Sequence, residues 1–156
     1  MLPRERLGTI SFMEKNLIAQ LNVDNSPEKQ DKCRIKQYQE QIGLIDGWKV
    51  PSTTYWLYAD GKPVGFGSIR HFLTDALRKA GGHIGYGIAP KYREKGYGKK
   101  ILGLLLAEAS RLGIDRVLVT IQLNNAASKA VALANGGVIT EQTDERIYVW
   151  IDAAHI

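Results

Sequence analysis

Cysteines and long apolar runs are scarce in this chain of 156 residues. A single cysteine excludes an internal disulfide framework and argues against a cysteine-based metal cluster. No apolar run approaches the ~18 residues that a membrane span needs. Charged residues interrupt the first twenty positions, which is not the pattern of a secretory leader. We therefore expect a cytoplasmic protein without a membrane segment.

The composition is that of an ordinary globular domain. Hydrophobic residues make up 44% of the chain and charged residues 24%. A chain of about 150 residues buries roughly 70% of its unfolded surface, so a substantial core can form. Since one domain usually holds roughly 100–200 residues, we predict a single domain over residues 1–156.

The positive charge is concentrated in one segment. The chain has 21 Lys and Arg against 16 Asp and Glu, a net charge of +5. Residues 91–100 (KYREKGYGKK) contain five basic residues and one glutamate, which is +4 of that total. A nucleic-acid-binding protein would spread its basic residues and interleave aromatic ones. We therefore expect one local anion site and no nucleic-acid partner.

Hydrophobic periodicity predicts an α/β fold. Residues 1–47 are read as a helical N-terminal part, with helices near 12–21 and 35–45 and no clear first strand. Residues 53–151 form the predicted core, which begins with a hairpin (53–59 and 63–70) around Asp60 and Gly61. Residues 72–80 are either a short helix or a loop. Strands follow at 83–89, 116–122 and 146–151, and helices at 97–112 and 126–135. This order implies a mixed, mostly antiparallel sheet with flanking helices, and a parallel crossover between 83–89 and 116–122.

A glycine-rich basic turn lies between strand 83–89 and the helix after it. Glycines at 96 and 98 let the backbone approach a ligand closely, and the start of a helix favours phosphate. A Walker loop would need Ser or Thr where Lys100 stands, and a dinucleotide fingerprint would need glycine where Ile101 stands. The turn therefore predicts a polyphosphate site of another kind.

The motif R-x-x-G-x-G at residues 93–98, between a strand and a helix and followed by a strand and an Asn-led helix, resembles the GNAT superfamily of acetyl-CoA-dependent N-acetyltransferases. The resemblance covers roughly residues 53–140. The strings GGHIGYGIAP and REKGYGKKIL look like a bacterial branch of predicted acetyltransferases. The resemblance to the GNAT superfamily implies a GNAT-like fold with a splayed parallel strand pair, acetyl-CoA as acyl donor, no metal, and an amine acceptor. Members of the superfamily often form homodimers.

The same resemblance implies a set of CoA-binding residues. The pyrophosphate would lie on the turn and the pantetheine arm along the preceding strand, with the next helix start beside it: Arg93, Lys95, Gly96, Tyr97, Gly98 and Lys99; Gly87, Ile88 and Ala89; Asn125 and Ser128. Asn124 or Asn125 could also be only a helix cap, and the capping and CoA-binding roles of Asn125 can hold together. The glycines at 85 and 87 either admit a ligand or merely relieve packing.

The sequence signals for the catalytic and acceptor-binding residues are less specific than those for the CoA-binding residues. The family often has a tyrosine as general acid where this chain has Ala132, so Tyr148, Tyr97 and Tyr86 are possible replacements, of which we assign Tyr148. His83 is the predicted base, because its ordinary pKa of about 6.5 suits proton transfer. Trp48, Tyr55 and His71 are the candidate acceptor-binding residues, and His71 is also a second candidate base. Two functions stay open: an N-acetyltransferase, or a non-catalytic acyl-CoA sensor of the same fold.

Overall fold

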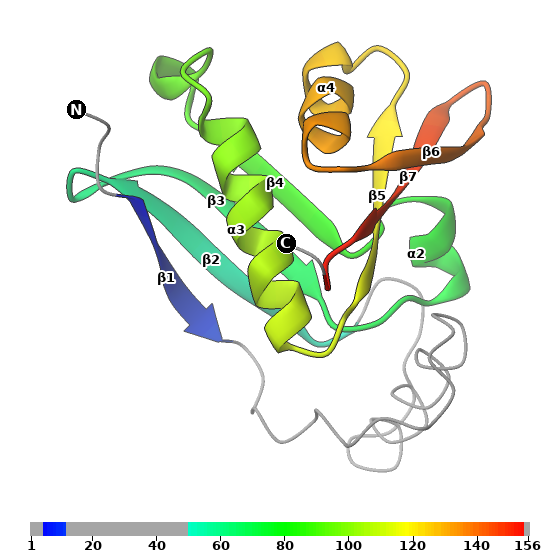
Figure 1. Cartoon of the computed structure of the whole chain (residues 1–156), viewed down its shortest axis with the longest axis horizontal. Coiled ribbons are helices and arrows are strands. Elements are labelled where there is room, and N and C mark those ends of the chain that lie inside the picture. The colour runs from blue at the N-terminus through cyan, green and yellow to red at the C-terminus, as the bar shows by residue number, and fades with distance from the viewer. Residues whose placement is uncertain (1–4, 12–49, 155–156) are drawn as a thin grey trace.

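The computed structural model describes residues 5–11 and 50–154 (Figure 1). Four antiparallel strands form the first sheet in the order β1-β2-β3-β4: Glu5–Ser11, Ser52–Ala59, Lys62–Arg70 and Ile84–Ile88. Asp60 and Gly61, which join β2 to β3, have φ of 50° and 78°. Two successive positive φ angles are typical of a type I′ hairpin turn, which confirms the predicted hairpin.

Three antiparallel strands form the second sheet in the order β5-β7-β6: Arg116–Gln122, Arg146–Asp152 and Val138–Gln142. A short 3-10 turn at Pro90–Tyr92 leads from β4 to helix α3 (Tyr97–Arg111), and α4 (Ala126–Ala134) follows β5. Helix α2 (Asp75–Lys79) lies between β3 and β4 in sequence. None of the helices in the described ranges is long and apolar enough to cross a membrane.

The main core lies between helix α3 and the sheets. The helix buries one face made of Ile101, Leu102, Leu105, Leu106 and Ala109. Alternate residues of β2 pack in the same cluster, as do Val64 and Ile69 of β3. Strand β5 contributes Val117, Val119 and Ile121. A second, smaller cluster of Leu73, Leu77 and Leu118 packs with Tyr148 and Trp150 around α2. The two clusters place α3 and α2 on opposite faces of β5.

Strands β4 and β5 touch at one point and then diverge. His83, just before β4, hydrogen-bonds with Leu118 of β5. Beyond that contact β4 belongs to one sheet and β5 to the other. Figure 1 shows the two strands separating toward the edge from which α3 and α4 start. The predicted α/β architecture with a splayed pair is confirmed. The described strands form two antiparallel sheets, however, and not the single mixed sheet that was expected, because β4 and β5 separate before they can pair.

Two strands were not predicted. Residues 5–11 form β1, although no first strand was expected there, so the helical description of residues 1–47 is wrong for this part. Val138–Gln142 form β6, which the sequence analysis did not assign to any element. Residues 72–80 contain a short helix, α2, which settles the alternative left open for them. The helices expected near 12–21 and 35–45, and Trp48, lie outside the described residues.

Candidate functional site

The start of α3 presents backbone donors without helical acceptors. Gly96, which precedes the helix, has φ of 86°, a left-handed conformation that favours glycine. The first helical hydrogen bond runs from the N–H of Lys100 to the carbonyl of Gly96, at 3.2 Å. The N–H groups of Tyr97, Gly98 and Lys99 therefore have no helical carbonyl to bond. Because Gly96 has no side chain to cap them, and the helix dipole is positive here, the site favours an anion.

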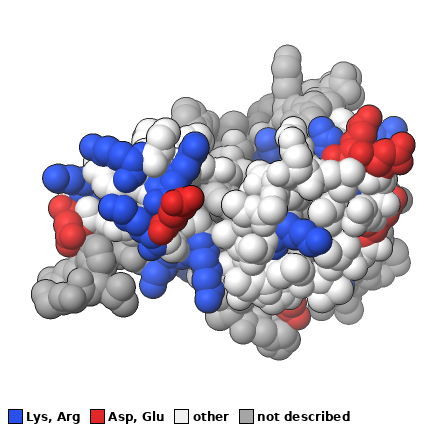
Figure 2. Space-filling model, turned by 90° about the horizontal axis from the view of Figure 1, so that it is seen from above, with Lys and Arg blue, Asp and Glu red and all other residues white. Residues whose placement is uncertain are grey.

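Cationic side chains surround this helix start. Lys91, Arg93, Lys95 and Lys99 are exposed, and the one acidic residue among them is Glu94. Figure 2 shows blue side chains gathered at this end of the molecule, and a group of red ones at the other end. The guanidinium of Arg93 donates from Nε to the carbonyl of Ile88, at 3.1 Å. This bond holds the basic loop against the end of β4, so charge and helix dipole act at the same place.

Two hydrogen bonds fix which backbone groups of β4 face its neighbour β3. The N–H of Arg70 donates to the carbonyl of His83 at 2.7 Å, just before β4. The N–H of Ala89 donates to the carbonyl of Val64 at 2.9 Å, just after β4. In an antiparallel pair the residues alternate between exchanging hydrogen bonds and pointing away. These two bonds therefore determine which residues along β4 bond to β3 and which point away from it.

By this alternation, Gly85 and Gly87 bond to β3, opposite Ser68 and Phe66. The N–H and C=O groups of Tyr86 and the N–H of Ile88 point away from β3, toward the opening between the sheets. The pantetheine contacts predicted at residues 87–89 thus fall on an open edge, but the groups that face it belong to Tyr86 and Ile88. The sequence pointed to Tyr86 only as a possible acid, because the direction of its backbone groups depends on the strand's register.

Tyr86 also links the two walls of the opening through its side chain. Burial raises the pKa of Tyr86, and a hydrogen bond with Ser128 of α4 partly offsets this. Asn125, the cap of α4, accepts a hydrogen bond from the N–H of Ser128 at 3.1 Å. The capping interpretation of Asn125 is therefore confirmed. The structure brings Ser128 to the side chain of Tyr86 and Gly98 close to it, since a Cβ on Gly98 would lie 3.9 Å from the Tyr86 ring.

The comparisons with known proteins agree with this geometry. The model of the acetyltransferase (GNAT) family matches residues 16–136, more than half of the chain. The chain belongs to the GNAT acetyltransferase family. No curated protein sequence matches it.

Several solved structures share the GNAT fold. Campylobacter jejuni N-acetyltransferase PseH in complex with acetyl coenzyme A is 12% identical, with a TM-score of 0.57 over 96% of this chain and 99% of that one. YncA, a putative acetyltransferase from Salmonella typhimurium with its cofactor acetyl-CoA, is 18% identical, with a TM-score of 0.53 over 80% and 73% of the two chains. Mycobacterium smegmatis RimJ in complex with CoA-disulfide is 21% identical, with a TM-score of 0.54 over 76% and 61%.

In this GNAT chain the predicted base, His83, is 2% exposed. Its Nδ1 accepts a hydrogen bond from the backbone N–H of Leu118 at 2.9 Å. Its ring packs edge-on against Trp150, with 6.3 Å between the ring centroids. The imidazole therefore lies at the point where β4 meets β5, within the packed interior.

The predicted acid, Tyr148, lies on the α2 face of the second sheet. Its hydroxyl donates to the carbonyl of Lys79, at the end of α2, at 2.6 Å. The neighbouring turn is also tied down, because the N–H of Gly81 donates to Thr120 Oγ1 at 2.8 Å. Arg70 donates to the carbonyl oxygens of Gly81 and Gly82 at 3.0 and 3.1 Å. The hydroxyl of Tyr148 is therefore one of several hydrogen-bonding groups that hold the end of α2 and the following turn against the second sheet.

Of the predicted acceptor residues, Tyr55 is buried in the main core on the α3 side, and burial raises its pKa to about 12. The Nε2 of His71 lies 2.8 Å from the hydroxyl of Thr53 and the two are hydrogen-bonded. The structure does not bring Tyr55 and His71 together at the opening.

Trp56 and Phe66 are two aromatic side chains on the open face of the first sheet. Their ring centroids lie 5.9 Å apart, and Phe66 is 51% exposed. Phe66 is paired with Gly87, and a Cβ on that glycine would lie 3.4 Å from the phenyl ring. Burial alternates along β2, with Tyr55 and Leu57 buried, and this places Trp56 on the opposite face. The continuous apolar run YWLYA shows no such alternation in the sequence.

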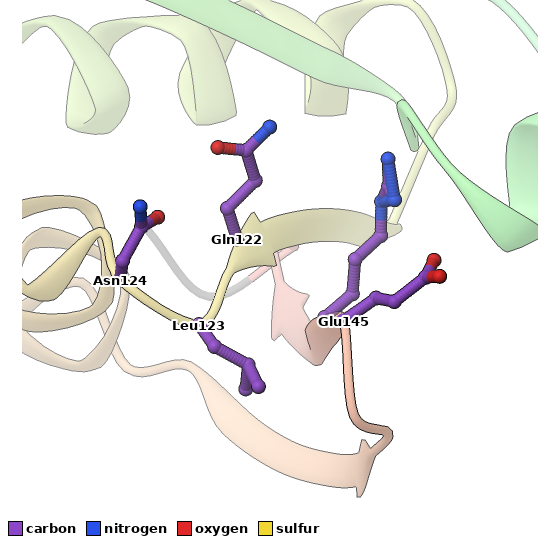
Figure 3. A pocket seen from close by; sticks show the side chains of 5 residues that line it. Gln122, Leu123, Asn124 and Glu145 are labelled. Atoms are coloured by element: carbon purple, nitrogen blue, oxygen red, sulfur yellow. The ribbon is translucent and has the colours of Figure 1, made fainter.

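A shallow pocket of about 330 Å³ lies where β5 ends and β7 begins. It is lined by Gln122, Leu123, Asn124, Glu145 and Arg146, and Figure 3 shows Gln122 and Leu123 pointing to opposite sides of the chain. The N–H of Leu123 donates to the carbonyl of Glu145 at 3.3 Å, which joins the two segments. In the described part of the chain, no group of three or more His, Cys, Asp or Glu residues is placed to hold a metal ion.

Proposed function

We propose that this GNAT chain is an acetyl-CoA-dependent N-acetyltransferase that transfers the acetyl group directly from the thioester to a primary amine of a small molecule or peptide. One observation carries the proposal: three N–H groups without helical partners at the start of α3 lie beside the open edge of β4. A pyrophosphate fits the first feature and an amide-bearing arm fits the second. Family membership supports acetyl transfer as the chemistry.

The binding roles follow from position. Tyr97, Gly98 and Lys99 would donate backbone N–H groups to the pyrophosphate, and Arg93 with Lys95 would add charge. The arm would bond to the backbone of Tyr86 and Ile88 on the open edge of β4. Asn125 and Ser128 would form the opposite wall, at the start of α4.

The chemistry is a nucleophilic attack of the neutral amine on the thioester carbonyl. A carbon–nitrogen bond forms, negative charge develops on the carbonyl oxygen, and the carbon–sulfur bond then breaks. A backbone N–H on the β4 edge would stabilise the developing oxyanion, and such preorganised donors contribute about 3 kcal/mol. The amine loses a proton to solvent or to a base, and the thiolate is a fair leaving group near neutral pH, so no covalent intermediate on the protein is needed.

The predicted acid–base pair is supported less well than the binding site. The proton of the Tyr148 hydroxyl is donated to a backbone carbonyl, and the imidazole of His83 is engaged between two strands. Ala132, at the position where the family often has tyrosine, is fully buried. This last observation favours the second candidate function, an acyl-CoA sensor without turnover.

Thiol release from acetyl-CoA, measured against a panel of primary amines, distinguishes the two functions. Amine-dependent release with acetylated product supports the enzyme. Tight CoA binding without amine-dependent release across the panel supports the sensor. Arg93→Ala should weaken CoA binding by about tenfold or more, because it removes a charge beside the pyrophosphate. Arg111→Ala is the matched control: it removes the same charge from the other end of α3, where Arg111 pairs with Glu108.

A further inference from the structure

Residue 83 joins three strands at the point where the two sheets separate. The carbonyl of His83 accepts from the N–H of Arg70 on β3 at 2.7 Å, and its N–H donates to the carbonyl of Leu118 on β5 at 2.8 Å. Its side chain adds a third bond, because Nδ1 accepts from the N–H of Leu118 at 2.9 Å. His83 and Leu118 therefore exchange two hydrogen bonds, one through the backbone and one through the imidazole.

The imidazole takes the place of a backbone carbonyl. In a continued strand pair, the N–H of Leu118 would bond to a carbonyl of the neighbouring strand. Here the carbonyl of His83 is turned to β3, so a side-chain acceptor is needed. Glycine at position 82 makes the approach possible: its φ is 60°, and a Cβ there would collide with the carbonyl of Leu118. Beyond this contact β4 and β5 are in separate sheets.

We infer that His83 is a positioning residue that sets the separation of β4 and β5, and thereby the width of the opening that takes the acetyl-CoA arm. The inference rests on the proposed function for the identity of the ligand. A ring nitrogen that accepts a hydrogen bond carries no proton, so the neutral imidazole holds its proton on Nε2. In this state Nδ1 is occupied by Leu118 and Nε2 is a donor. The side chain therefore closes the base of the opening instead of accepting the substrate's proton.

Substitutions that keep or remove the acceptor test this role. His83→Asn keeps an oxygen near the position of Nδ1 that can accept from Leu118, but an amide cannot act as a base at neutral pH. His83→Leu has similar bulk and no acceptor. The readouts are the Kd of acetyl-CoA by calorimetry and the kcat and KM of the transfer reaction, all at a temperature at which each variant is folded.

For His83→Leu we expect the Kd and KM of acetyl-CoA to rise about tenfold or more. For His83→Asn we expect both constants and kcat to stay within about threefold of the wild-type values. A loss of kcat in His83→Asn with an unchanged Kd would overturn the inference and assign His83 as the base. Failure of His83→Asn to fold would also overturn it, because the retained acceptor should preserve the contact.

The outcome is separable from that of the proposed function. If the wild-type protein binds acetyl-CoA but acetylates no amine, the proposed transfer reaction fails, yet the Kd values of the two variants still decide the role of His83. An unchanged Kd in the folded His83→Leu variant contradicts the inference in either case.

Discussion

Gly85 lies in the middle of β4, where a side chain would stabilise the strand. Ile84, Tyr86 and Ile88 pack against the main core, so the side chain of residue 85 would point to the opposite face of the sheet. A Cβ built there meets no described atom within 4 Å. The packing of the described chain therefore gives no reason for glycine at this position. We infer that the space is reserved for a ligand, and Gly85→Ala tests this.

The expected magnitudes follow from that free space. Replacing glycine by alanine without strain stabilises a protein by about 0.4–1 kcal/mol, because the unfolded chain loses conformational freedom. For a chain of this size, 1 kcal/mol corresponds to an increase in Tm of about 2–4 °C. If the thioester or the amine occupies the space, the new methyl group should lower kcat/KM by about tenfold, which is about 1.4 kcal/mol of transition-state stabilisation.

The assay combines thermal unfolding with steady-state kinetics. Gly67→Ala is the matched control on the neighbouring strand: its Cβ would lie 2.5 Å from Cδ1 of Leu105, so it should destabilise the fold by about 1–3 kcal/mol. Gly85→Val should lower kcat/KM further than Gly85→Ala. If Gly85→Ala raises Tm and leaves kcat/KM unchanged, no ligand uses the space and the reasoning is refuted.

Three further outcomes follow from single contacts. In a double-mutant cycle measured by urea unfolding, Tyr86→Phe and Ser128→Ala should show a coupling free energy of about 1 kcal/mol. Additive effects would mean that the hydrogen bond between Tyr86 and Ser128 contributes nothing to stability. Tyr148→Phe should lower the free energy of unfolding by about 1 kcal/mol through the lost bond to Lys79 while kcat changes less than about threefold; a much larger fall in kcat would restore Tyr148 as the acid. Burial raises the pKa of Tyr55 to about 12 from 10.0, so its stabilising contribution is complete below pH 10 and is lost as the pH rises toward 12. In urea unfolding at alkaline pH, the wild type should therefore lose up to about 1.4 kcal/mol of unfolding free energy per pH unit relative to Tyr55→Phe. Equal losses in both proteins would contradict this.

The conformation of the basic turn at residues 91–100 could be predicted because its signals are local. Glycine at 96, the basic residues around it and the apolar period of the following helix all lie within one segment, and the structure gives Gly96 the positive φ that the motif requires. The hairpin was predictable for the same reason, since Asp60 and Gly61 stand between two apolar strands.

The two missed strands lack such local signals. All five residues of β6 are exposed, so the strand has no alternation of buried and exposed positions for periodicity to detect. Strand β1 is held by pairing with residues 53–59 of β2, which are more than forty residues away in the chain. Its pattern ERLGTIS, with glycine in the middle, is weak by itself.

The contacts of the two predicted catalytic residues could not be predicted from the sequence, because residue type suggests a role but does not identify the partner. His83 and Tyr148 are residue types that transfer protons, and nothing in the sequence indicates that one bonds to the N–H of Leu118 and the other to the carbonyl of Lys79. Both partners are at least 35 residues away. Such contacts are set by how the two sheets meet.

The two open sets of backbone groups, considered together, narrow the ligand class. The N–H groups at the start of α3 would be satisfied by any phosphate, including that of a simple nucleotide. The edge of β4 that no described strand pairs with needs a partner that both donates and accepts along an extended path, as another strand would. The bond from Arg93 to the carbonyl of Ile88 places the two sets in direct succession. A ligand that satisfies both must carry a phosphate group and, attached to it, an extended chain with amides, which is the construction of coenzyme A and not of a free nucleotide.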